Sequence, residues 1–242
     1  PMLIKFSDWV VVLCNALTDE QMETMLQTEH GGMNEVLADV YQLTGDKKYL
    51  AAAKKFSQKA ILNPLVQHQD KLTGLHANTQ IPKVIGFKRI ADLDHDSDYN
   101  SAAHFFWQTV VNNRTVAIGG NSVAEHFNPV NDYSKMMEDV AGPETCNSYN
   151  MLKLTKALFL TDGLQQYIDF YEKALYNHIL SSQLQGKGGF VYHTPMRPGH
   201  YRVYSQPATS MWCCVGTGME NHLKYNELIY AQQDKDLYIN LF

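Results

Sequence analysis

The feature that most constrains the fold is a helix–turn–helix unit that occurs three times, each time with a tyrosine after a short polar turn. The turns and their tyrosines are Thr44-Gly45-Asp46 with Tyr49, Asp94-His95-Asp96 with Tyr99, and Thr161-Asp162-Gly163 with Tyr167. Apolar residues recur at helical spacing on both sides of each turn, at 33–43 and 47–56, at 77–93 and 98–113, and at 144–161 and 164–182. The irregular spacing of the units excludes a regular solenoid. The pattern predicts a mainly α fold of helical hairpins, arranged either as an (α/α) toroid around a central pocket or as an irregular bundle.

Additional helices are predicted outside these hairpins, at 2–17, 19–28 and 219–230. Long polar connections separate the helices, at 57–75, 114–143 and 183–215. Connections of such length are uncommon in compact domains unless they carry function. We therefore look for functional residues in these three segments.

In the C-terminal part of the sequence, strand-like patterns appear among the helical ones. A strand-like run occurs at 189–193, and another at 237–242 follows the turn-forming Asp234-Lys235-Asp236. We expect a helical domain at 1–230 and the beginning of a β domain at 231–242. Because the sequence starts with Pro1 and stops within a strand-like run, we also expect a fragment of a longer protein, whose signal peptide could lie outside it.

Composition narrows the classes of partner. The net charge is −5 and no basic run or stripe occurs, which disfavours nucleic acid. No apolar run approaches the ~20 residues that a membrane helix needs, so no membrane span is predicted. With 45% hydrophobic and 19% charged residues, the chain is expected to form a packed core.

Two adjacent cysteines stand in the stretch Trp212-Cys213-Cys214-Val215-Gly216-Thr217-Gly218. Neighbouring cysteines do not form a disulfide with each other without strain, so they need another partner, and Glu144-Thr145-Cys146 offers one. The fourth cysteine, Cys14, lies in an apolar helical run and is interpreted as a core thiol. Three thiols and a carboxylate suit tetrahedral zinc, although the usual Cys-x-x-Cys spacing is absent. The residues alone fit a zinc site and a set of inert buried thiols equally well.

A second candidate group surrounds Glu125, which follows the glycine pair Gly119-Gly120. The glycines suggest a backbone that approaches another group closely, whereas a single glutamate in a loop is more often simply solvated. His30 precedes Gly31-Gly32, and His76 lies just before a predicted helix. Polar side chains in such positions either bind a sugar or cap the helix.

Four segments in this order resemble glycoside hydrolase family 127, the β-L-arabinofuranosidase-type enzymes, in the branch common among gut Bacteroidetes. The segments are Gly74-Leu75-His76-Ala77-Asn78-Thr79-Gln80-Ile81-Pro82-Lys83, Gly119-Gly120-Asn121-Ser122-Val123-Ala124-Glu125-His126-Phe127, Gly142-Pro143-Glu144-Thr145-Cys146-Asn147-Ser148-Tyr149-Asn150, and Cys213-Cys214-Val215-Gly216-Thr217-Gly218. The similarity spans nearly the whole chain. It implies a partial (α/α)6 barrel that lacks its first helices and is followed by β-sandwich domains.

The resemblance also implies an activity, a cofactor and a set of site residues. The implied activity is retaining hydrolysis of β-L-arabinofuranosides or related plant sugars, with a glycoside or oligosaccharide as substrate. The implied cofactor is Zn²⁺, held by Glu144, Cys146, Cys213 and Cys214. Cys213 would be the nucleophile and Glu125 the general acid/base, and the sugar contacts would come from His30, His76 and Tyr192.

Two other functions stay open. Sugar epimerases and unsaturated-glycuronide hydrolases also use helical toroids and need no thiol. A closed four-ligand site is typical of structural zinc, so a non-catalytic carbohydrate-binding module is the other alternative. A fragment that lacks barrel helices could also behave as such a module although its parent is an enzyme. The resemblance is compatible with a periplasmic or secreted full-length protein.

Overall fold

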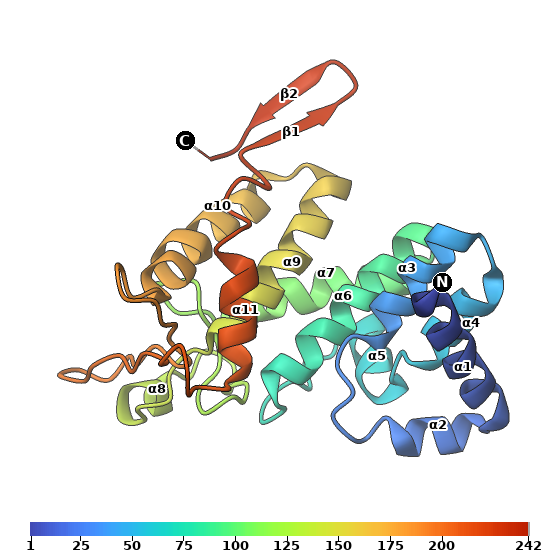
Figure 1. Cartoon of the computed structure of the whole chain (residues 1–242), viewed down its shortest axis with the longest axis horizontal. Helices are drawn as coiled ribbons and strands as arrows, with labels where there is room; N and C mark the ends of the chain where they lie inside the picture. Colours follow the sequence, from blue (N-terminus) through green and yellow to red (C-terminus); the bar gives the residue numbers. More distant parts are fainter. Residues whose placement is uncertain (242) are drawn as a thin grey trace. The chain divides into compact units, whose positions relative to one another are not determined.

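The computed structural model describes residues 1–241, which form two compact units (Figure 1). The first unit comprises Pro1–Lys71 and Thr79–Phe106, and the second comprises Leu72–Asn78 and the chain from Trp107 onward. Both are mainly helical, and the described residues contain one sheet, of two strands. The predicted mainly α class is confirmed. No helix of residues 1–241 has the length and apolarity that crossing a membrane would require.

Helices make up most of the first unit. They are α1 (Met2–Ala16), α2 (Asp19–Met25), α3 (Met33–Thr44), α4 (Lys47–Lys55), α5 (Lys59–Val66), most of α6 (Ala77–Asp94) and the first part of α7 (Ser97–Asn113). Helices α3 and α4 form a hairpin that turns at Gly45, where φ is +72°. Asp46 then caps α4 by accepting the N–H of Lys48 at 3.0 Å. The buried Tyr49 donates its hydroxyl to Asp8 at 2.7 Å, which joins α4 to α1.

Helix α5 lies within the segment that was predicted as a connection, 57–75. It contains Pro64, which lacks the N–H of a helical hydrogen bond and therefore suggests a break in a sequence pattern. The buried side chains of Leu62 and Leu65 explain why the helix forms nevertheless, because their burial offsets the lost bond.

The second unit is organised around α9. Its elements are the short α8 (Ser134–Glu138), α9 (Thr145–Asp162), α10 (Gln165–Ala174), a π-helical turn (Leu175–Ile179), a 3₁₀ turn (Leu180–Ser182) and α11 (Cys213–Asn221). Helix α9 turns into α10 at Gly163, where φ is +66°. It packs against both α10 and α11. This packing brings the start of α11 beside the start of α9.

The prediction of a helix at 219–230 is wrong, because α11 runs from Cys213 to Asn221. The cysteine pair thus opens a helix and is not part of the preceding connection. Gly216 and Gly218 lower the helix propensity of this stretch, so the sequence pattern did not indicate a helix there. Packing requires one of them: a Cβ at Gly218 would lie 2.6 Å from Cγ of Phe190.

The described chain ends in a β-hairpin. Strands β1 (Tyr230–Gln233) and β2 (Asp236–Ile239) pair antiparallel, and the turn residue Asp234 has a φ of +52°. The predicted turn at 234–236 is therefore confirmed, while Phe242 of the predicted strand lies outside the described residues. The beginning of a β-sandwich at 231–242 stays a prediction.

Candidate metal centre and active site

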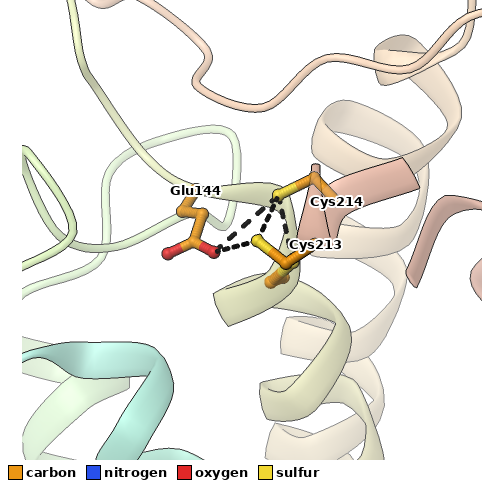
Figure 2. Close-up of side chains that lie close together, drawn as sticks. Glu144, Cys213 and Cys214 are labelled. Carbon is orange, nitrogen blue, oxygen red and sulfur yellow. Dashed lines mark hydrogen bonds between the residues drawn. The ribbon is translucent and has the colours of Figure 1, made fainter. Parts of the chain in front are cut away.

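The N-termini of α9 and α11 carry the three cysteines that the sequence singled out. Figure 2 shows Glu144, Cys213 and Cys214 close together. Glu144 is the N-cap of α9 and Cys146 is its second residue, while Cys213 and Cys214 open α11. The first turn of a helix presents unpaired N–H groups and a positive dipole end, so two such ends favour negative charge between them. The fold thus gathers acidic ligands where the backbone stabilises their anions.

The four side chains form one compact cluster, in which the ligand atoms all lie within 4.8 Å of one another. Cys213 Sγ lies 3.9 Å from Cys214 Sγ and 3.7 Å from Glu144 Oε1. Cys214 Sγ is also 3.7 Å from Glu144 Oε1, and Cys146 Sγ is 3.0 Å from Cys214 Sγ. All three cysteines are free thiols. The predicted set of Glu144, Cys146, Cys213 and Cys214 is therefore brought together.

Three of these four distances suit a tetrahedral metal ion, whereas Cys146 Sγ and Cys214 Sγ, at 3.0 Å, are closer together than two ligands of one ion. With metal–sulfur bonds of about 2.3 Å, the sulfur atoms of a zinc tetrahedron lie about 3.8 Å apart. The 3.9 Å separation within the cysteine pair and both 3.7 Å sulfur–oxygen separations approach that value. Glu144 Oε2 is buried without a hydrogen-bond donor among residues 1–241, so a cation would supply a missing partner. The donor set, three thiols and a carboxylate, fits Zn²⁺.

The four side chains of the cluster differ in their exposure to solvent. Glu144, Cys146 and Cys214 are at most 1% exposed, whereas Cys213 is exposed. Burial raises the pKa of Glu144 to about 8, which shows how strongly this carboxylate requires a counter-charge to ionise. Hydrogen bonds from the thiols of Cys146 and Cys214 lower the pKa of Cys213. Cys213 is therefore both the accessible thiol and one whose thiolate form its neighbours stabilise.

Glu125 lies in a tight hairpin turn of the connection between α7 and α8. The N–H of Val123 donates to the carbonyl of His126 and the reverse bond is also made, each at 3.0 Å. The two central residues, Ala124 and Glu125, have φ of +44° and +68°, as in type I′ turns, which favour Asn and Gly. Residues with side chains hold such backbone angles at a cost, and this strain occurs often at functional sites.

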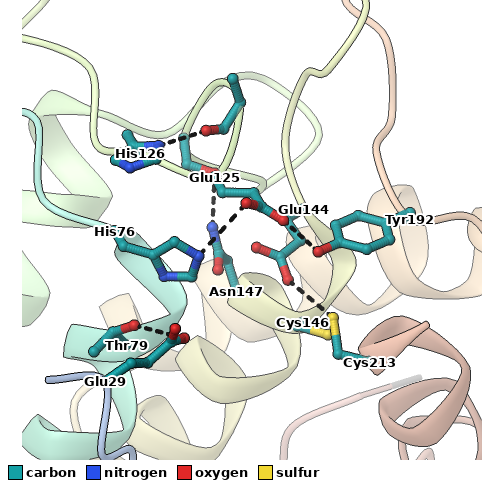
Figure 3. Close-up of polar contacts among 12 residues, drawn as sticks. Glu29, His76, Thr79, Glu125, His126, Glu144, Cys146, Asn147, Tyr192 and Cys213 are labelled. Atoms are coloured by element: carbon teal, nitrogen blue, oxygen red, sulfur yellow. Dashed lines mark hydrogen bonds and ion pairs between the residues drawn. The ribbon is translucent and has the colours of Figure 1, made fainter. Parts of the chain in front are cut away.

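The carboxylate of Glu125 is held between two side chains (Figure 3). Tyr192 donates its hydroxyl to Oε1, and Nε2 of His76 lies 3.6 Å from Oε2. Burial and the neighbouring side chains of Cys213 and Glu125 raise the pKa of the Tyr192 phenol. One phenol is therefore a neighbour of both the predicted acid/base and the predicted nucleophile.

Tyr192 comes from an extended segment that pairs with the start of α9. The N–H of Thr145 donates to the carbonyl of Tyr192 at 3.0 Å, and that of Thr194 donates to the carbonyl of Pro143 at 2.9 Å. The pairing needs glycine at position 142, because a Cβ there would lie 2.2 Å from the carbonyl oxygen of Thr194. The strand-like pattern at 189–193 is thus realised as isolated bridges.

Of the predicted sugar contacts, His76 and Tyr192 lie beside Glu125 in the second unit, and His30 belongs to the first unit. Burial lowers the pKa of His30, which favours its neutral form. Its loop is anchored by Thr79, which donates its hydroxyl to Glu29 at 2.9 Å. A sugar contact from His30 stays a prediction.

Sequence reasoning missed two polar residues next to the cluster. Asn147, which follows Cys146, donates to Ser122 Oγ at 2.6 Å and so ties α9 to the loop of Glu125. Thr217 Oγ1 lies 3.1 Å from Cys146 Sγ. Its position four residues after Cys213, on the same helix face, is a signal that could have identified it.

The fold resembles those of several solved glycoside hydrolases. A solved structure described as a glycoside hydrolase matches 99% of this chain and 44% of its own, with a TM-score of 0.73 and 16% identity. A GH127 beta-arabinofuranosidase matches with a TM-score of 0.70 and 24% identity, over 87% of this chain and 34% of its own. The GH127 beta-L-arabinofuranosidase Ara127N-Se from Geobacillus stearothermophilus T6 matches with a TM-score of 0.67 and 22% identity, over 88% and 39%. The chain therefore spans less than half the length of these structures, and the likeness concerns the fold.

A comparison of the sequence with models of protein families identifies the family. The model of the beta-L-arabinofuranosidase GH127 catalytic domain matches residues 1–227, and the chain belongs to this family. A comparison with curated proteins gives no match. The predicted family and the helical-toroid type of fold are thus confirmed.

Proposed function

We propose that this chain carries the catalytic residues of a retaining glycoside hydrolase acting on β-L-arabinofuranosides or related plant-derived sugars. The observation that carries the proposal is the position of Tyr192, whose hydroxyl donates to Glu125 and whose phenol is a neighbour of Cys213. A shared neighbour keeps the Glu125 carboxylate and the Cys213 thiol in one site, as the two-step reaction of a retaining glycosidase requires. Retaining glycosidases keep their acid/base and nucleophile about 5–5.5 Å apart, whereas inverting enzymes need about 6.5–9.5 Å.

The zinc ion proposed for this site would be held by Glu144, Cys146, Cys214 and Cys213. When bound, it would favour the thiolate form of its cysteine ligands. Cys213 is the exposed member of the set, so it is the one that a sugar can reach. The buried Cys146 and Cys214 would stay in place and position it.

The reaction then needs two steps. Glu125 donates a proton to the glycosidic oxygen while Cys213 Sγ attacks the anomeric carbon, which breaks the carbon–oxygen bond and forms a thioglycosyl intermediate. Glu125, now ionised, takes a proton from water, and that water displaces the sulfur. Two inversions at the anomeric carbon give overall retention. Tyr192 and His76 orient the Glu125 carboxylate throughout.

The test is hydrolysis of an aryl β-L-arabinofuranoside by the full-length protein and by its Cys213→Ala and Glu125→Gln variants. Each substitution is expected to abolish turnover. Normal turnover by the Cys213 variant would instead favour an epimerase or unsaturated-glycuronide hydrolase, which needs no thiol. Sugar binding without turnover by the unaltered protein would favour a binding module with structural zinc.

A further inference from the structure

The Gly-Thr-Gly sequence after the cysteine pair is not explained by metal ligation alone. Gly218 allows α11 to approach Phe190, as described above, but Thr217 is half-buried and faces the cluster. Its hydroxyl lies 3.1 Å from Cys146 Sγ, across the interface between α11 and α9. Thr217 is thus the residue of α11 that contacts the ligand carried by the other helix.

The hydroxyl of Thr217 differs in its partner from those of four other helical threonines in this chain. Thr24, Thr44, Thr155 and Thr161 each donate to the carbonyl four residues earlier, at 2.6–3.2 Å. That bond is the usual local partner for a threonine within a helix. At Thr217 the hydroxyl points to sulfur instead, so the bond links two helices and not two turns of one helix.

The direction of this hydrogen bond follows from the state of the sulfur. A cysteine that binds a metal is deprotonated, so Cys146 Sγ would have no proton to donate and the Thr217 hydroxyl would be the donor. Three thiolates and one carboxylate carry four negative charges, and a divalent cation neutralises two of them. Two negative charges therefore stay buried, and each hydrogen bond donated to a ligand stabilises them.

We propose that Thr217 is a positioning residue that donates its hydroxyl to Cys146 Sγ and holds this sulfur as a permanent metal ligand. Cys146 is 0% exposed and receives this bond, whereas Cys213 is exposed. The asymmetry leaves Cys213 as the ligand that can leave the metal and react. The inference rests on the metal site of the proposed function.

The test compares Thr217→Val, which keeps the shape but removes the hydroxyl, with Thr217→Ser, which keeps the hydroxyl. Zinc affinity is measured by competition with a chromophoric chelator, and Co²⁺ replaces zinc for absorption spectroscopy. The valine variant is expected to bind zinc about 10–100-fold more weakly, as for other residues that support metal ligands. Its sulfur-to-cobalt charge-transfer band is expected to move to lower energy, because an unbonded thiolate donates more charge. The serine variant should restore both properties.

Thr161→Val is the matched control, because that hydroxyl donates to the carbonyl of Ala157 at the opposite end of α9 from Cys146. It should leave zinc affinity and the cobalt spectrum unchanged. If the Thr217→Val protein does not fold, Thr217→Ala removes the same hydroxyl without adding a methyl contact and is judged by the same criteria. Unchanged affinity and spectrum without the hydroxyl, or no recovery with serine, would overturn the proposal. Neither measurement uses a substrate, so a protein that binds zinc normally but hydrolyses no glycoside would refute the proposed function alone.

Discussion

The phenol of Tyr192 donates a hydrogen bond to Oε1 of Glu125 although 67 residues separate them in the chain. The rings of His193 and Trp212 are neighbours of the Tyr192 ring, with centroid separations of 4.4 and 6.1 Å. Since Trp212 immediately precedes the cysteine pair, this packing links the orientation of the phenol to the start of α11. Tyr192 therefore joins the loop of the carboxylate to the helix of the thiols.

Replacing Tyr192 by phenylalanine is expected to reduce kcat/KM on an aryl arabinofuranoside by about 10–100-fold. A hydrogen bond to a charged group contributes about 1.5–3 kcal/mol, and this one orients the carboxylate that must exchange a proton. Steady-state kinetics of the full-length protein measure the effect. Tyr201→Phe is the control, because Tyr201 is 71% exposed and should tolerate the change. Equal losses in both variants would contradict a specific role for Tyr192.

The purified protein is expected to contain about one zinc ion per chain, in keeping with one four-ligand site. Removing the ion with a chelator should lower the melting temperature, because the folded state loses a ligand that the unfolded state binds poorly. Elemental analysis and a thermal scan before and after chelation provide the measurements.

Two cysteine variants test where that zinc binds. Cys214→Ala should abolish zinc binding, whereas Cys14→Ala should not, because Cys14 is a buried thiol outside the cluster. If the Cys214→Ala protein kept a full complement of zinc, the ligand set described above would be incorrect.

Low pH should destabilise the second unit through His178. This histidine is 0% exposed and hydrogen-bonded to Ser148 Oγ at 2.7 Å and Thr194 Oγ1 at 3.1 Å. Burial lowers its pKa to about 3, so it stays neutral in the folded chain while the unfolded chain takes up a proton below its ordinary pKa of 6.5. The stability that it contributes is fully present above pH 6.5. It is lost as the pH falls from there toward 3, with a slope that approaches about 1.4 kcal/mol per pH unit.

Urea unfolding at several pH values between 7.5 and 5 measures this dependence. The difference between the wild type and a His178→Gln variant isolates the contribution of the one histidine. The wild type should lose stability more steeply below pH 6.5 than the variant. His200→Gln, at an exposed position, should follow the wild type. Parallel curves for the wild type and the His178 variant would show that this ring is not a buried neutral group.

The sequence predicted the helical hairpins well because each has a strong apolar period and a polar turn, as at Gly45 and Gly163. It failed where tertiary contacts override local preference. The turn at Ala124 and Glu125 has neither Asn nor Gly at its positive-φ positions, and pairing of the flanking residues holds it in place. The four ligands were named through family resemblance, since residue spacing alone left inert thiols equally acceptable. Their convergence depends on the packing of α9 against α11, which no local pattern encodes.

The two glycines of α11 should respond oppositely to alanine. A Cβ at Gly218 would lie 2.6–2.9 Å from three ring atoms of Phe190, so Gly218→Ala must displace the ring and is expected to cost about 1–3 kcal/mol of unfolding free energy. Gly216 has no atom within 4 Å of its added Cβ, and alanine favours helix, so Gly216→Ala is expected to stabilise by about 0.5–1 kcal/mol. Chemical denaturation followed by circular dichroism compares the two variants directly. Because both changes add the same methyl group to the same helix, a similar effect of both would mean that Phe190 does not pack against α11 as described.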